Sequence, residues 1–137
     1  MEIKKKLKVS AEHFYDSIIR SVVYDIDKTT GRTLKNSQLE GFEYVKTFSQ
    51  NNQAKIIIDR VETNRYYQFR TQTTRNEFTA NYTITPIDNQ SCEVIYHETM
   101  TSVGAVQKVN DFFVGLILGY FKKKQFIKML ESIETAH

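Results

Sequence analysis

Residues 78–100 read FTANYTITPIDNQSCEVIYHETM, and this stretch decides the fold. From Phe78 to Ile84, apolar side chains alternate with polar ones, a period of two that is typical of a half-buried strand. Pro86 cannot donate to a strand ladder, so it marks the end of that strand or a sheet edge. Asp88-Asn89 is a turn signal, and residues 92–100 alternate again. The stretch therefore predicts two antiparallel strands joined by a hairpin.

Three further strand patterns precede this hairpin, and turn residues such as Asn64 separate them. With the hairpin they make five strands at a spacing of roughly 10–12 residues, which is typical of an antiparallel meander. The five predicted strands are 42–48, 54–61, 66–70, 78–85 and 92–100.

A strand is also predicted at the beginning of the chain, over residues 2–9. Ile3, Leu7 and Val9 lie on one side of it and lysines on the other. Lys5 interrupts the apolar row, which favours a position near a sheet edge.

The predicted helices lie on either side of the meander. Ser10 is a favoured N-cap, and apolar residues recur after it at helical spacing, which predicts a helix over 11–24 that ends in the polar stretch 27–31. A short helix is plausible around 34–39. The last segment, from Ala105 to about Thr135, predicts one long helix whose centre, residues 112–121, is apolar on nearly all sides. Such a helix is buried on most faces, and its centre is too short to span a bilayer.

Composition narrows the class of protein. The chain has 137 residues, 40% of them hydrophobic, which fits a single domain over residues 1–137 rather than a disordered segment. Its one cysteine excludes an internal disulfide framework, and its N-terminus lacks the apolar stretch of a secretory signal, so we expect a cytoplasmic protein. A net charge of +3 gives no strong electrostatic footprint for nucleic acid.

The order of these elements resembles the START-like superfamily, also called SRPBCC or helix-grip, to which the polyketide cyclases and the birch-pollen allergen belong. The resemblance covers the whole chain and rests on the junction Val9-Ser10-Ala11-Glu12, the strand start Gly41-Phe42-Glu43-Tyr44, the paired last strands and the terminal helix. Within the superfamily, the sequence is similar to a small bacterial family of unknown function. The resemblance implies an α+β fold in which a curved antiparallel sheet wraps around a long C-terminal helix, with one or two short helices after the first strand. It also implies a cavity that binds hydrophobic or amphipathic ligands in many members.

Aromatic residues are the best candidates for lining that cavity. The chain has nine Phe and eight Tyr but no Trp. Buried tyrosines offer apolar area together with a hydroxyl that needs a partner, which suits a small-molecule site. The alternative is that they only fill a core, and the sequence does not separate the two. The predicted cavity residues are Tyr44, Tyr67, Phe69, Tyr82, Tyr96, Glu98, Phe113, Ile117 and Tyr120.

Residues for chemistry are sparse. His13 and His137 are expected in solvent, and His97 is expected on the face opposite Tyr96. No clustered ligands predict a metal or another cofactor, and Cys92 suits an apolar core. Glu98 is the one weak catalytic candidate, because it shares a strand face with Tyr96; the alternative is a solvated or paired acid. Arg60 and Arg70 either orient an anionic ligand or are exposed strand residues.

The sequence therefore favours a non-catalytic binding protein for a hydrophobic or amphipathic small molecule. One alternative is an enzyme of the cyclase or dehydratase type that uses Glu98 as acid or base. Another is a protein-interaction module with basic clusters that dock an acidic partner. We expect neither a nucleic-acid partner nor a membrane-spanning segment. The protein could also form a homodimer.

Overall fold

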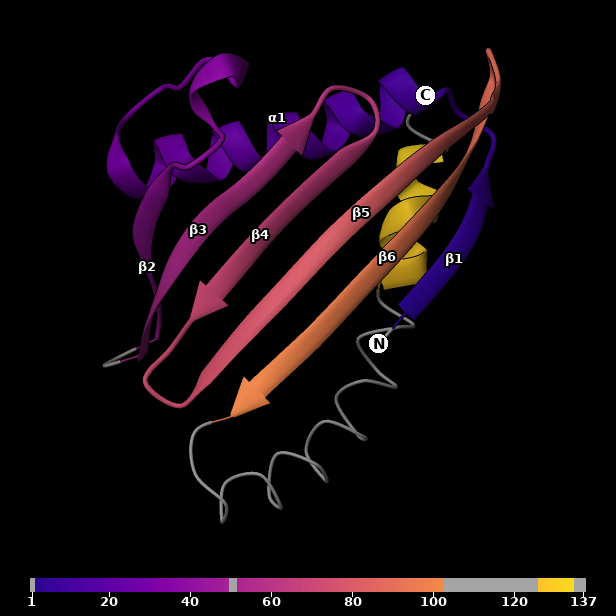
Figure 1. Ribbon diagram of the computed structural model, residues 1–137. Coiled ribbons are helices and arrows are strands. Elements are labelled where there is room, and N and C mark those ends of the chain that lie inside the picture. Colours follow the sequence, from indigo (N-terminus) through magenta and orange to yellow (C-terminus); the bar gives the residue numbers. More distant parts are fainter. Residues whose placement is uncertain (1, 50–51, 103–125, 135–137) are drawn as a thin grey trace.

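The computed structural model describes residues 2–49, 52–102 and 126–134 (Figure 1). In chain order the elements are β1 (Glu2–Leu7), α1 (Ala11–Thr30), the 3-10 helix η1 (Asn36–Gln38), β2 (Glu43–Ser49), β3 (Asn52–Glu62), β4 (Tyr66–Gln72), β5 (Asn76–Asp88) and β6 (Ser91–Ser102). Residues 126–134, here called the C-terminal helical segment, are also helical. The remainder of the long helix predicted from Ala105 onward lies outside the described residues.

The strands form one six-stranded antiparallel sheet in the order β1-β6-β5-β4-β3-β2. The predicted meander is confirmed, because each strand from β2 to β6 pairs with the next. β1 adds to the outer side of β6 and is an edge strand, as the interruption of its apolar row by Lys5 predicted.

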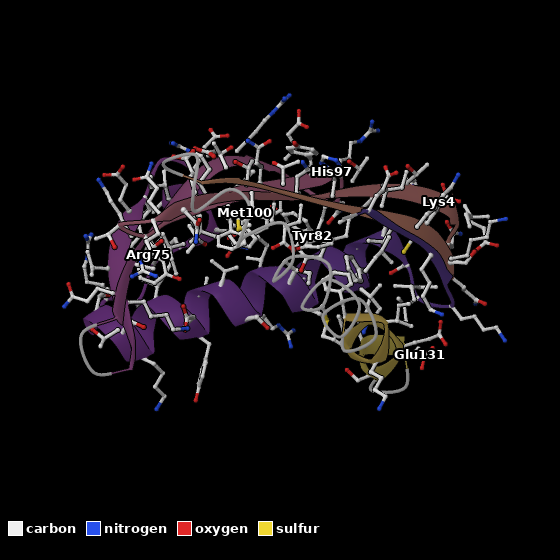
Figure 2. The ribbon with its side chains drawn as sticks, turned by 90° about the horizontal axis from the view of Figure 1, so that it is seen from below. Lys4, Arg75, Tyr82, His97, Met100 and Glu131 are labelled. Carbon is white, nitrogen blue, oxygen red and sulfur yellow. The ribbon has the colours of Figure 1, made fainter. Side chains whose placement is uncertain are left out.

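The sheet is curved, and both helical parts lie on its concave face (Figures 1 and 2). In Figure 2, Tyr82 points from the sheet toward the helices, whereas His97 points away from them. This arrangement confirms the helix-grip architecture. The core lies between the concave face and α1, where Phe14, Ile19 and Ile58 are fully buried.

Pro86 lies inside β5 rather than at its end, opposite Cys92 of β6. The amide of Ile84 donates to the carbonyl of Arg65 on the β4 side at 2.7 Å, and the last β4–β5 pair is Tyr66 with Thr83. Backbone amides two residues apart in a strand point the same way, so the nitrogen of Pro86 faces the β4 side, as the amide of Ile84 does. β4 no longer pairs with β5 at that position, so the missing N–H of Pro86 breaks no strand hydrogen bond. Pro86 therefore occupies a local sheet edge, which was one of the two predicted positions.

Helix α1 is longer than the predicted segment 11–24, so that boundary was wrong. It continues to Thr30 and ends at Gly31, whose positive φ of 76° suits glycine and whose amide donates to Asp27. The polar residues that suggested a turn lie in the last turns of the helix, where Ile26 is fully buried and anchors them to the core. The predicted short helix at 34–39 is only η1, with Leu34 and Leu39 buried on either side of it.

Ser10 is the N-cap of α1, as predicted: its hydroxyl oxygen accepts the amide of His13 at 3.0 Å. We expect Ser10→Ala to lower the free energy of unfolding by about 1 kcal/mol, because that amide loses its partner. Urea unfolding followed by circular dichroism measures this change. Ser17→Ala is the matched control, since the hydroxyl of Ser17 donates to a helix carbonyl, that of His13, and caps nothing. Equal losses in the two variants would contradict the capping role.

Among the described residues, no helix is long and apolar enough to cross a membrane.

Candidate ligand site on the concave face

Three tyrosines form a row across the middle of the concave face. The strand register places Tyr82 directly opposite Tyr67 on one side and Tyr96 on the other. The ring centroids are 6.3 Å apart for Tyr67 and Tyr82, and 5.1 Å apart for Tyr82 and Tyr96. Side-chain period and register together therefore bring residues from β4, β5 and β6 into one aromatic surface.

Each helical part contributes an aromatic ring to this surface. Phe126, in the C-terminal helical segment, stacks on Tyr96 with ring centroids 4.1 Å apart. Phe14 of α1 packs against Tyr82 at 6.1 Å. With Phe69, whose ring centroid lies 5.6 Å from that of Tyr67, these residues make the site mostly apolar.

A carboxylate accepts the hydroxyl of a tyrosine on each side of the row. At β6, the hydroxyl of Tyr96 donates to Glu98 at 2.9 Å, and Glu98 is only 8% exposed. On β2, the hydroxyl of Tyr44 donates to Asp25 of α1 at 2.6 Å. Lys46 also lies 2.6 Å from Asp25, so that acid is part of an ion pair. Tyr44 on β2 thus extends the row of three, and the phenols of Tyr44 and Tyr96, here called the outer phenols, each have a carboxylate as their acceptor.

The two inner phenols differ from the outer ones. Within the described part of the chain, the hydroxyls of Tyr67 and Tyr82 have no hydrogen-bond partner, although their side chains are only 4% and 8% exposed. Across the same residues, every fully enclosed polar side-chain atom has a partner. Since the two hydroxyls lack partners, they are not fully enclosed. Each of the two hydroxyl oxygens therefore keeps some accessible surface.

Burial and charge keep these phenols protonated. Burial raises the pKa of Tyr82 and Tyr96, and the charge of Glu98 raises both pKa values further. Burial raises the pKa of Tyr44 and Tyr67 as well, with a smaller contribution from Asp25 in each case. Burial alone would raise the pKa of Asp25, but the hydrogen bonds from Lys46 and Tyr44 leave it below its usual value. The site therefore combines protonated phenols with an ionised acid at Asp25.

A protein-family model matches most of this chain. The model of a domain of unknown function, DUF3284, matches residues 1–119. The chain belongs to this family. Its resemblance to a family of unknown function, predicted above, is confirmed. No curated protein matches the sequence.

Solved structures share the fold of this DUF3284 protein at low sequence identity. A START superfamily protein from Mycobacterium smegmatis is 11% identical with a TM-score of 0.64, over 100% of this chain and 98% of the other. Norcoclaurine synthase from Thalictrum flavum, solved with dopamine and hydroxybenzaldehyde, is 9% identical with a TM-score of 0.57, over 99% and 84%. An aromatase/cyclase from Streptomyces is 11% identical with a TM-score of 0.52, over 77% and 68%. These likenesses establish the START-like fold of the DUF3284 chain.

Most of the predicted cavity residues that are described lie together on the concave side. The aromatic contacts and the hydrogen bonds given above join Tyr67, Phe69, Tyr82, Tyr96 and Glu98 into one cluster, and Tyr44 lies on β2, where it contacts Asp25. The other predicted residues, Phe113, Ile117 and Tyr120, lie outside the described residues. Whether the cluster is a ligand site stays a prediction.

Other predicted candidates lie away from this cluster. Arg70 pairs with Asp59 at 2.9 Å and Arg60 with Glu62 at 2.9 Å; Arg60 is exposed, whereas Arg70 is half-buried. His97 is exposed on the convex face, as predicted. His13 is half-buried rather than in solvent, because it lies in the first turn of α1, where the helix meets the sheet. Cys92 is fully buried in the core, and burial raises the pKa of its thiol to about 11.

Asp25 and Phe126 were missed as site residues. Asp25 follows Ile18 by seven residues and so shares its helix face. The sequence prediction missed it because the predicted helix ended at residue 24. Phe126 lies in the predicted terminal helix, but periodicity along that helix does not tell which ring meets Tyr96.

Proposed function

We propose that this protein binds a hydrophobic or amphipathic small molecule on the concave face of its sheet, beside the tyrosine row. The observation that carries the proposal is the pair of hydroxyls on Tyr67 and Tyr82, which lie in an otherwise apolar, buried surface and lack partners among the described residues. Ligand sites commonly combine apolar walls with a few polar groups that fix orientation.

The fold supports this proposal independently. Norcoclaurine synthase, which shares the fold, was solved with two small aromatic molecules bound. A fold that accommodates such molecules in one protein is compatible with a similar ligand here, although fold alone does not identify it.

Tyrosines on both faces make a direct test feasible. We expect a neutral amphipathic probe such as Nile red to shift the NMR signals of carbon-13-labelled rings at Tyr67, Tyr82 and Tyr96. The rings of Tyr66 and Tyr24 are internal controls, because Tyr66 lies on the convex face beside Arg60 and Tyr24 is 64% exposed on α1. At a probe concentration of 100 times Kd, binding would stabilise the protein by about 2.7 kcal/mol.

Two results of this experiment would contradict the proposal. Signal changes confined to Tyr24 and Tyr66, or no change with neutral, cationic or anionic amphipaths, would show that the concave face does not accept such a ligand.

A second candidate function rests on Glu98. A buried carboxylate whose oxygen accepts a phenol hydroxyl at 2.9 Å, next to the row, has the components of an acid–base site of the cyclase or dehydratase type. Its test is turnover of a ligand found by the screen above: conversion that Glu98→Gln abolishes while binding persists would support the enzyme, and unchanged recovery of the ligand would favour simple binding.

A further inference from the structure

The outer and inner tyrosines of the row differ in whether their hydroxyls have a hydrogen-bond acceptor. Tyr44 and Tyr96 donate to Asp25 and Glu98, respectively. The two inner hydroxyls, on Tyr67 and Tyr82, have no acceptor among the described residues. A ligand bound against the row would therefore meet two phenol donors that have no acceptor among the described residues.

Those inner phenols favour an acceptor on the ligand. A protonated phenol can donate or accept, but the nearby charge of Glu98 stabilises the protonated form of Tyr82, and Asp25 does the same for Tyr67. A carbonyl oxygen supplies an acceptor without adding charge. An aromatic ligand would in addition suit a surface built of aromatic rings, such as those of Tyr82 and Phe126, whose centroids are 5.8 Å apart.

The charges on this side of the sheet disfavour anions. Lys46 is paired with Asp25 at 2.6 Å, and Lys5 is paired with Glu131 of the C-terminal helical segment at 3.4 Å. Glu98 is buried beside the row. In the described part of the chain, a carboxylate on the ligand would therefore meet cations already paired with acids and would lose its hydration.

We propose that Tyr67 and Tyr82 determine the specificity of this site by donating hydrogen bonds to an uncharged acceptor, such as a ketone or ester carbonyl, on an aromatic ligand, and that carboxylates are selected against. The inference rests on the proposed function, since it names the ligand class of the same site.

Three fluorescent probes that differ at one position test it: methyl 6-(dimethylamino)-2-naphthoate, the corresponding free carboxylate, and 2-(dimethylamino)naphthalene, which lacks the acceptor. We expect the ester to bind the full chain at least tenfold more tightly than the carboxylate. Tyr67→Phe and Tyr82→Phe should each weaken ester binding roughly three- to tenfold, the effect of one lost neutral hydrogen bond, and leave the acceptor-free probe unchanged.

Tyr66→Phe is the matched control. It removes a hydroxyl from the same strand as Tyr67 but from the opposite face, where that hydroxyl donates to Gln68 at 2.5 Å. Circular dichroism verifies that all variants are folded. Unchanged ester affinity in both inner variants, or a carboxylate that binds as tightly as the ester, would overturn the assignment of specificity while the proposed function stands. Absence of binding by all three probes, and by Nile red, would overturn both.

Discussion

Raising the pH from 8 to 11 is expected to lower the free energy of unfolding by roughly 5–6 kcal/mol, the sum for four tyrosines at about 1.4 kcal/mol each. The four are Tyr44, Tyr67, Tyr82 and Tyr96, whose pKa values burial raises above the usual value of about 10. In the unfolded chain they ionise near pH 10, whereas in the folded chain they stay protonated. Their contribution is therefore fully present below pH 10 and is lost as the pH rises toward the folded pKa values.

Urea unfolding at pH 8, 9, 10 and 11, followed by circular dichroism, measures this loss. Tyr67→Phe separates the tyrosines from lysines that also lose protons in this range, because the variant should lose about 1.4 kcal/mol less than the wild type between pH 8 and 11. Tyrosinate absorbance at these four positions should appear only as the protein unfolds. Full ionisation of all eight tyrosines in a chain that stays folded would contradict the burial of the row.

Phe14→Ala is expected to lower the free energy of unfolding by about 3–5 kcal/mol, the usual cost of deleting a buried phenylalanine ring. Phe14 is fully buried and packs against Tyr82, so its removal leaves a void between α1 and the middle of the sheet. A loss of this size is a large fraction of the stability of a typical domain.

Tyr24→Ala is the control on the same helix. Its ring is 64% exposed and lies 5.5 Å from the Lys28 ammonium, so we expect a loss below about 1 kcal/mol. The two variants are compared by urea unfolding at pH 8. Similar losses would show that Phe14 does not anchor α1 to the sheet.

Local patterns in the sequence predicted the elements well. Alternation gave the meander strands, Ser10 marked the start of α1, and Lys5 placed β1 near an edge. The end of α1 was wrong because Asp27, Lys28 and Thr30 were interpreted as a turn, whereas burial of Ile26 continues the helix. Long-range packing outweighed local preference there.

The candidate site could be predicted in part. The period of two places Tyr96 and Glu98 on one face of β6 and Tyr82 on one face of β5, so each strand's contribution followed from the residues alone. The sequence did not predict the hydrogen bond from Tyr44 to Asp25 or the stack of Phe126 on Tyr96, because these contacts join segments far apart in the chain.

The sequence by itself determined which side chains share a face, since that depends only on the period of a strand or helix. Only the tertiary structure decided that Tyr67, Tyr82 and Tyr96 are neighbours, that Tyr44 and Tyr96 donate to acids and that the two inner hydroxyls lack acceptors among the described residues. The physical reason is that register and helix docking are set by the burial of apolar surface across the whole chain, and no local pattern encodes a distance between segments.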